Sequence, residues 1–296
     1  MDKPTANFIQ MMRDRVDSLR EQGDLKEALH AASALVDKCQ HALGPDLDKI
    51  DAFVASLEAR AEIYMELEQF EEALEDAKQA IDQLDSRSDR CGAIGRLYTM
   101  IGNAYDELGK NDAMVSALES AMEFFEKRDP PLLMDVAAIA NNLGFAAKAA
   151  GNLDGAEDYF LKSLHIMHSE LGDKDPETAS VSNNLGAVYL AAGYYEQARE
   201  MHMMALEARR DAFGEEHEDT AQSHNNLALA LLQTGDRTWA RKHFEKSLSA
   251  FESLGSDHVE DLEAVASNYC DFLREEGEEN LAKVIDQRVK EALQAD

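Results

Sequence analysis

The sequence contains little cysteine and no long apolar segment. Its 296 residues include three cysteines, Cys39, Cys91 and Cys270, each on a stretch with the apolar periodicity of a helix. Isolated cysteines on such stretches indicate buried, reduced thiols and argue against a disulfide framework. Charged residues interrupt every apolar stretch before it reaches the ~18 residues of a membrane span, and the start of the chain is too charged for a signal peptide. We therefore expect a cytoplasmic protein without membrane insertion.

Positive charge is also scarce. Lysine and arginine together number 29, against 59 aspartates and glutamates, so the formal net charge is −30 at pH 7. Phosphate backbones and anionic membranes need clustered positive charge, and a nucleic-acid partner is therefore not expected. The acidity suits a basic partner, or it serves solubility or adaptation to a salty cytoplasm without any role in binding.

The common motifs of enzymes and nucleotide-binding proteins are missing. The sequence contains no Gly-x-x-x-x-Gly-Lys loop, no Gly-x-Gly-x-x-Gly turn, no His-Glu-x-x-His pair and no Gly-x-Ser-x-Gly elbow. His165 and His168 share one expected helix, but no carboxylate or cysteine completes a repeated ligand set beside them. We expect no catalytic residues, no cofactor and no metal.

What the sequence does contain is a motif that returns every 42 residues. Asn141–Gly144 reads Asn-Asn-Leu-Gly, Asn183–Gly186 repeats it, and Asn225–Ala228 reads Asn-Asn-Leu-Ala. The same phase reaches Gly102 upstream and Cys270 downstream. A fixed period of this size is typical of solenoids of stacked helical hairpins, in which each hairpin buries its apolar face only against its neighbours.

A second marker of the repeat is a turn followed by a small residue. The alanines after the turns are again 42 residues apart: Ala156, Ala198, Ala240 and Ala282. Similar turns upstream begin at Gly23, Glu68 and Gly109. Apolar residues between the markers have helical spacing, and no linker rich in proline, glycine or serine interrupts the phase. The pattern predicts one all-α domain over residues 1–296, with hairpins at about 5–42, 47–84, 89–127, 131–171, 175–213, 217–254 and 258–294.

These motifs resemble tetratricopeptide repeats. The carrying residues are Asn-Asn-Leu-Gly, the turn glycine Gly151 or Gly193, and then Ala156 or Ala198. The usual repeat of that family has ~34 residues, and the longer form here is similar to the repeats of kinesin light chains and their bacterial relatives. The resemblance implies a right-handed superhelix of about seven hairpins, with a concave groove that binds protein partners.

The paired asparagines are the most specific candidate site. Asn141, Asn183 and Asn225 stand beside Asn142, Asn184 and Asn226. With Leu143 and Gly144 packed inward, these amides lie on the flank that the resemblance assigns to the groove. An amide donates and accepts hydrogen bonds, so it can bind the backbone of an extended peptide. Alternatively, one asparagine of each pair bonds to the next hairpin and holds the solenoid together, and both roles can coexist.

An apolar strip is expected further along the same face. Its members are Phe145, Ala187 and Leu229, and one turn later Lys148, Leu190 and Leu232. If exposed, they suit an amphipathic segment, and otherwise they pack on the neighbouring helix. Relatives that bind acidic peptides use Lys and Arg beside the asparagines. Here Lys148 and Arg96 are accompanied by acids, which favours a neutral or basic peptide. These acids are Asp106, Glu107, Asp271 and Glu275.

We therefore expect a non-enzymatic adaptor that holds a peptide or helix of a protein partner in its groove. A peptide-sensing regulator of a signalling protein is one alternative. Another is a homo-oligomeric scaffold, for which Phe8, Ile9, Met11 and Met12 on the first helix would supply an apolar patch.

Overall fold

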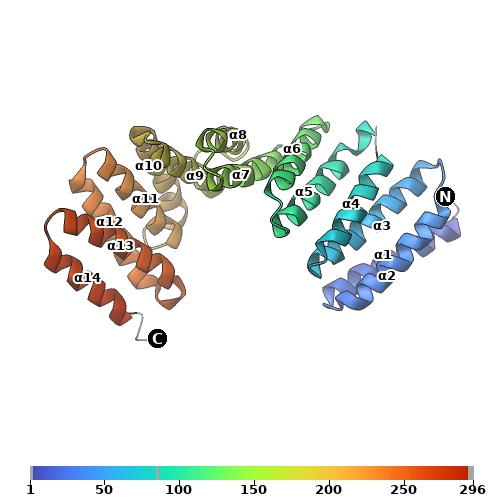
Figure 1. Cartoon of the computed structure of the whole chain (residues 1–296), viewed down its shortest axis with the longest axis horizontal. Helices are drawn as coiled ribbons and strands as arrows, with labels where there is room; N and C mark the ends of the chain where they lie inside the picture. Colours follow the sequence, from blue (N-terminus) through green and yellow to red (C-terminus); the bar gives the residue numbers. More distant parts are fainter. Residues whose placement is uncertain (1–2, 85–86, 293–296) are drawn as a thin grey trace. The chain divides into compact units, whose positions relative to one another are not determined.

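The computed structural model describes residues 3–84 and 87–292 of the chain, so residue 294, the predicted end of the last hairpin, lies outside the described part (Figure 1). The described residues form fourteen α-helices and two 3-10 helices, with no strand among them. The helices are α1 Lys3–Glu21, α2 Leu25–Ala42, α3 Leu47–Glu66, α4 Phe70–Leu84, η1 Ser88–Arg90, α5 Cys91–Glu107, α6 Asn111–Lys127, α7 Leu133–Ala149, α8 Leu153–Leu171, α9 Pro176–Ala192, α10 Tyr195–Phe213, α11 Glu218–Gln233, α12 Arg237–Leu254, η2 Ser256–His258, α13 Val259–Glu275 and α14 Glu279–Ala292. The prediction of an all-α solenoid of hairpins is confirmed.

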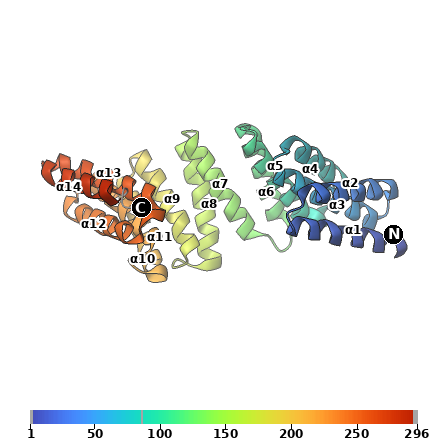
Figure 2. The same ribbon diagram turned by 90° about the horizontal axis from the view of Figure 1, so that it is seen from below.

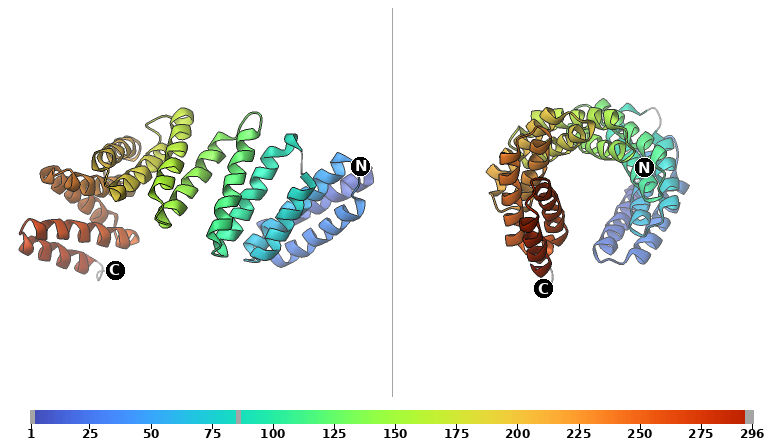
Figure 3. Two further views of the ribbon diagram at one scale, coloured as in Figure 1. Left: turned by 45° about the horizontal axis from the view of Figure 1, so that its top comes forward. Right: turned by 60° about the vertical axis from the view of Figure 1, so that its left-hand side comes forward.

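The chain divides into two compact units, Met1–Ile139 and Ala140–Asp296, and the boundary falls inside α7. In unit 1, three hairpins follow one another as α1/α2, α3/α4 and α5/α6 (Figure 2). In unit 2, α8 packs on α9, and the hairpins α9/α10, α11/α12 and α13/α14 follow in order (Figure 3). The interpretation of the whole chain as one domain stays a prediction.

The first helices of successive hairpins also contact one another. In unit 2, α11 packs against α9 and α13, and in unit 1 α1 packs against α3. The helix α10, which is the second helix of its hairpin, packs against both α9 and α11. We call the surface formed by the first helices the inner face of each unit. It consists of α1, α3 and α5 in unit 1, and of residues 140–149, α9, α11 and α13 in unit 2.

Capping residues set the ends of the helices as the sequence indicates. The Asp175 side chain accepts the backbone N–H of Glu177 at 2.8 Å, and Pro176 takes the first position of α9. Gly193 ends that helix in the left-handed conformation, with φ of 83°, where a side chain would be strained. Glu68 occupies the equivalent turn of the second hairpin with φ of 59° although it is not glycine. The turns of the structure therefore lie at the positions that the sequence repeat indicates.

The small residue of the repeated motif allows close packing between the two helices of a hairpin. A Cβ atom added to Gly144 would lie 2.7 Å from the Phe160 ring, and one added to Gly102 would lie 2.6 Å from Leu118. Both distances are shorter than carbon atoms tolerate, so the glycines are required by the helix contact. The motif thus marks where each second helix crosses its partner.

The core runs along the hairpins and has no single centre. Phe53, Leu57 and Leu97 belong to the buried cluster of unit 1, and Phe244 and Phe272 to that of unit 2. The three cysteines are buried and free, which confirms the expectation from their positions. None of the described helices is both long and apolar enough to cross a bilayer.

Candidate functional site

The paired asparagines join neighbouring hairpins of unit 2 through their side chains. In each case Nδ2 of Asn184, Asn226 or Asn268, the last of which follows Ser267 and has no paired asparagine, donates to Oδ1 of the first asparagine of the pair in the preceding hairpin. The distances are 3.1 Å from Asn184 to Asn141, 2.9 Å from Asn226 to Asn183 and 3.2 Å from Asn268 to Asn225. We call these six residues the amide seam. The alternative in which the asparagines hold the solenoid together is therefore observed.

The seam still leaves amide groups at the surface. Asn142 is exposed, and Asn184 and Asn226 are half-buried, so the second asparagine of each pair reaches solvent. An amide carries two N–H donors and an acceptor oxygen, and the seam uses one donor of Asn184 and one of Asn226. Asn225, in contrast, is only 4% exposed and lies within the seam. Hairpin packing and ligand contact are thus compatible at Asn184 and Asn226.

The expected apolar strip is partly exposed. Phe145 is 45% exposed and packs edge-to-face on Phe160, with 5.3 Å between ring centroids. Leu190 is half-buried, and Leu229 packs against the core of unit 2 while keeping part of its surface. Lys148 is half-buried on the same helix as Phe145. The strip therefore exposes the aromatic ring of Phe145, whereas Leu190 and Leu229 are only partly exposed.

The inner face of unit 2 carries almost no charge from α7 to α11. Helix α9 has one charged residue, Glu177, and the charges of α11 are Glu218 and Asp219. All three acids lie in first turns, where the helix dipole favours negative charge. Charged residues make up 30% of the chain, so a stretch of this length without them stands out against the composition. Amide and apolar side chains fill the positions between.

Comparison with known proteins decides the family. The sequence matches the Tetratricopeptide repeat family over residues 135–211, 182–253, 54–83 and 95–127. The chain belongs to the tetratricopeptide repeat (TPR) family. No curated protein matches the sequence.

Solved TPR structures have the same fold. BtubC (BKLC) from P. vanneervenii has a TM-score of 0.61 at 22% identity, covering 78% of this chain and 92% of that one. A proposed kinesin light chain with nearly identical TPR-like repeats from Podosopora anserina has a TM-score of 0.55 at 21% identity, covering 68% and 95%. The C-terminal part of a TPR protein from Cytophaga hutchinsonii has a TM-score of 0.65 at 15% identity, covering 95% and 94%. At these identities the likeness shows the fold alone.

One TPR hairpin carries a buried histidine that the sequence argument missed. His202 on α10 is 1% exposed, and its Nδ1 lies 2.9 Å from Oδ1 of Asn183 in the amide seam. Burial, together with the nearby charges of Lys148 and Arg209, lowers the pKa of His202 to about 4. The ring is therefore neutral at physiological pH. The available signal was a histidine at the position where the neighbouring repeats have Phe160 and Phe244.

The two histidines that the sequence places on one helix, and for which no metal is expected, are both exposed in the structure. His168 Nε2 lies 2.7 Å from Asp173 Oδ1, and His165 is exposed. Elsewhere, His217, Glu218 and Asp219 place three donor atoms within 4.8 Å of one another. His217 Nδ1, however, accepts the backbone N–H of Asp219 at 3.2 Å and caps α11. These contacts account for the cluster without an ion.

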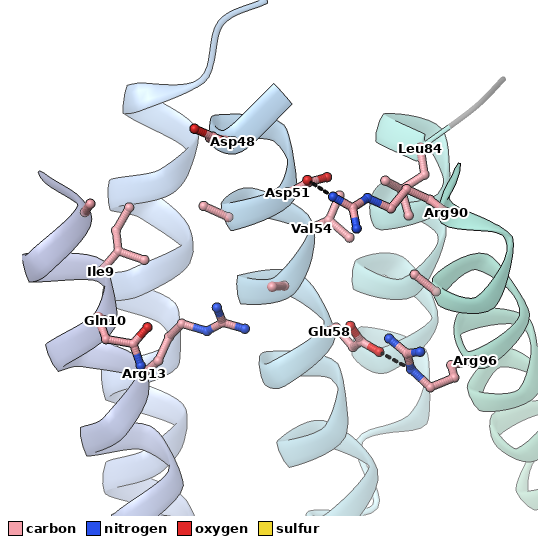
Figure 4. Close-up of a pocket in the computed structure, with 14 residues that line it drawn as sticks. Ile9, Gln10, Arg13, Asp48, Asp51, Val54, Glu58, Leu84, Arg90 and Arg96 are labelled. Atoms are coloured by element: carbon pink, nitrogen blue, oxygen red, sulfur yellow. Dashed lines mark hydrogen bonds and ion pairs between the residues drawn. The ribbon is translucent and has the colours of Figure 1, made fainter. Parts of the chain in front are cut away.

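The inner face of unit 1 has a different chemistry from that of unit 2. A pocket of about 490 Å³ lies between α1, α3 and α5, and small side chains such as Ala55 and Ala93 line it (Figure 4). Arg13 extends into it from α1, while Arg96 donates to Glu58 at 3.2 Å. Asp51 accepts from Arg87 at 2.6 Å and also from Arg90, which lines the pocket. Arg13, Arg90 and Arg96 therefore line the same pocket, although the chain as a whole is acidic.

Sequence reasoning singled out Arg96 but not Arg13 or Arg90. The residues one repeat after Arg13 and Arg90 are Ala55 and Leu132, so no repeated column of basic residues indicated them. Among the predicted residues, the structure gathers those of α7, α9 and α11 on one face of unit 2.

Proposed function

We propose that this TPR protein is a non-enzymatic adaptor, and that the inner face of unit 2 holds a peptide or helical segment of a partner protein. The observation that carries the proposal is the strip along α7, α9 and α11, whose contact residues are uncharged apart from Lys148, in a chain of net charge −30. TPR repeats generally serve protein interaction and lack catalytic groups. The contact residues are Asn142, Phe145, Lys148, Asn184, Leu190, Asn226 and Leu229, with Asn141, Asn183 and Asn225 supporting them in the seam.

The side chains of this face suit a neutral segment. Surface amides at Asn142, Asn184 and Asn226 can hydrogen-bond a ligand backbone whatever its side chains. Phe145 supplies an exposed ring for an apolar ligand side chain, which gains by leaving water. A charged ligand group that lies away from Lys148 would lose hydration without finding an opposite charge.

The neighbouring helix α13 favours a basic extension of that segment. Asp271 and Glu275 follow Leu229 and Gln233 at the repeat interval, and both acids are exposed. Their side chains contact Arg274 at 2.9 Å and Arg237 at 3.1 Å respectively, but each acid remains more than 60% open to solvent, at 69% and 66%. A lysine or arginine of the ligand lying over α13 would meet these carboxylates.

Self-assembly through the first helix is less well supported than the adaptor function. Of the expected apolar patch, Ile9 is 5% exposed and Met12 packs on the core, so Phe8 and Met11 remain as its exposed members. Lys38 Nζ lies 5.7 Å from the centroid of the Phe8 ring and covers part of it. The remaining patch is small for a stable contact.

The test uses peptides enriched on the protein from a displayed library of random 12-residue sequences. An enriched peptide, synthesised with a fluorescent label, is titrated with the wild-type protein and with a triple variant, Asn142→Ala, Asn184→Ala and Asn226→Ala. We expect the triple variant to bind at least tenfold more weakly while far-UV circular dichroism remains helical. Equal affinity for both proteins would contradict the proposal.

Two further variants keep this test decisive. Asn142 is exposed, so Asn142→Ala alone should weaken binding without affecting the fold, even if the triple variant unfolds. Asn103 is an exposed asparagine on α5 in unit 1, and Asn103→Ala is the matched control that should leave binding unchanged. Enriched peptides should also be neutral or basic, and a set of acidic peptides would refute the assigned charge preference.

A further inference from the structure

The second helices of unit 2 place an aromatic ring at one repeated position of the core. Phe160, His202 and Phe244 are 0%, 1% and 0% exposed. A Cβ atom added to Gly186 would lie 2.8 Å from the His202 ring, much as one added to Gly144 would lie 2.7 Å from Phe160. His202 therefore occupies a core site that the adjacent hairpins fill with phenylalanine, and its shape alone does not explain why a histidine is present.

The histidine differs from phenylalanine in the hydrogen bond that it makes. His202 Nδ1 lies 2.9 Å from Asn183 Oδ1, and the same oxygen accepts Nδ2 of Asn226 at 2.9 Å. An amide oxygen only accepts, so the neutral imidazole carries its proton on Nδ1. The phenylalanines of the adjacent hairpins cannot make this contact to Asn141 or Asn225.

Two donors on one oxygen fix the orientation of the Asn183 amide. The oxygen and the amino group of an asparagine exchange places when the amide turns by half a revolution. In the turned state, with the proton of His202 on Nδ1, the amino group of Asn183 would face the N–H groups of His202 and Asn226, and two part-buried hydrogen bonds would be lost. The oxygen is therefore held toward α10 and α11, and the amino group points away from them.

We propose that His202 is a positioning residue that holds Asn183 as a hydrogen-bond donor on the inner face of unit 2, where it selects a carbonyl oxygen of the bound segment. This inference rests on the proposed function and names the ligand group recognised at one point. Asn183 is half-buried, and its amino group is the part turned away from the seam. Asn184 beside it uses an N–H on Asn141 at 3.1 Å, which directs its oxygen the other way. The pair offers a donor and an acceptor, as a peptide unit requires.

The experiment compares His202→Phe with the wild-type protein by NMR and by binding. Because phenylalanine fills the equivalent sites, the variant should fold with unchanged helicity. The side-chain amide signals of Asn183, assigned through Asn183→Asp, should shift and broaden, while those of Asn141 and Asn225 stay in place. The enriched 12-residue peptide should bind His202→Phe at least fivefold more weakly. Phe244→Leu is the control, since it disturbs the equivalent core site without touching Asn183, and the Phe244 ring packs on Tyr269 and Phe272 and not on the contact residue Phe145.

The readouts separate this inference from the proposed function. Unchanged Asn183 signals in His202→Phe would overturn the positioning role, whether or not a peptide binds. Unchanged peptide affinity beside shifted Asn183 signals would also overturn it, because the donor would then not contact the ligand. If no peptide were enriched on the wild-type protein, the proposed function would fail, and the inference would fail with it. An equal loss of affinity in Phe244→Leu would assign the effect to core packing and refute the inference.

Discussion

His224 and His243 face each other inside one hairpin, with 2.7 Å between their Nδ1 atoms. On the other side of its ring, His224 Nε2 lies 3.0 Å from Glu215 Oε2, and Lys246 Nζ lies 3.2 Å from Glu215 Oε1. Burial lowers the pKa of His224, and it lowers that of His243 to about 4. Neutral His224 thus donates its Nε2–H to Glu215 and accepts the Nδ1–H of His243. A proton added to either ring would oppose this arrangement.

Buried neutral histidines make the fold sensitive to acid. The pKa of His202 is about 4 in the folded chain and about 6.5 when unfolded. Protons therefore bind the unfolded chain more tightly, and this stability is present above pH 6.5 and is lost as the pH falls toward 4. The loss from His202 at pH 4 is about 2–3 kcal/mol in the free energy of unfolding. Urea titrations followed by circular dichroism at several pH values measure it.

The matched control for the acid experiment is His202→Phe. Acid also relieves repulsion within a chain of net charge −30, which acts in the opposite direction. The difference between the wild type and His202→Phe removes this common contribution. We expect the variant to lose less stability than the wild type between pH 7 and pH 4. Parallel pH profiles for the two proteins would show that His202 does not titrate as described.

Filling the close helix contact should destabilise the fold. Alanine normally stabilises a helix relative to glycine by about 1 kcal/mol. Gly144→Ala would place a Cβ 2.7 Å from the Phe160 ring, and we expect a net loss of about 1–3 kcal/mol from overpacking. Gly92 is the control, because its added Cβ would lie 3.2 Å from the flexible Arg128 side chain. Gly92→Ala should leave the urea midpoint unchanged or raise it, and an equal loss in both variants would contradict the steric explanation.

The turn of the second hairpin offers a stabilising substitution. Glu68 has φ of 59°, in the left-handed region where the other turns have glycine. This conformation costs a residue with a side chain roughly 1–2 kcal/mol. Glu68→Gly should therefore raise the free energy of unfolding, measured by urea titration, by about 0.5–1 kcal/mol after the entropy of glycine is allowed for. Glu72→Gly, inside α4, should lower it instead, and a lower midpoint for both would show that Glu68 is not strained.

The sequence predicts the hairpins well because each repeat carries its own local signals for where its helices begin and end. Helices expected to begin near 175, 217 and 258 start at Pro176, Glu218 and Val259. Each start depends on local capping and on apolar spacing, both of which are visible in one repeat. The first hairpins depart from the 42-residue period in length, since the turn residues Gly23, Glu68 and Gly109 are 45 and 41 residues apart.

The candidate site could be predicted only in part. Periodicity placed the asparagines on one face, but an amide hydrogen-bonds a neighbouring hairpin as readily as a ligand, so spacing alone left its role open. The single histidine His202 and the arginines Arg13 and Arg90 do not recur at the period. Their partners, Asn183 for the first and Asp51 for the last, lie 19 and 39 residues away and meet them only in the folded chain.

Arg209 is a buried charge at a position where other repeats are apolar. It is 6% exposed, and its guanidinium donates to Ser223 Oγ at 3.0 Å and Ser180 Oγ at 3.1 Å. Its Nε has no partner in the described part of the chain. At the repeat interval, the residues before and after it are Met167 and Phe251. The site therefore accepts an apolar side chain of similar length.

Arg209 also donates to the Asp219 carbonyl at 3.2 Å and lies 3.4 Å from the Asp219 carboxylate. That carboxylate is 41% exposed, so removing the arginine leaves no buried, unpaired charge, and replacing Arg209 by methionine should cost little. Ser180 keeps a bond of its own, since its hydroxyl donates to the Pro176 carbonyl at 2.9 Å. We expect Arg209→Met to stay within about 1 kcal/mol of the wild type in urea unfolding, whereas Arg209→Ala leaves a cavity and should lose roughly 2 kcal/mol or more. If both variants lost the same amount, the charge and its bonds to the serines, and not the volume, would stabilise this junction of α9, α10 and α11.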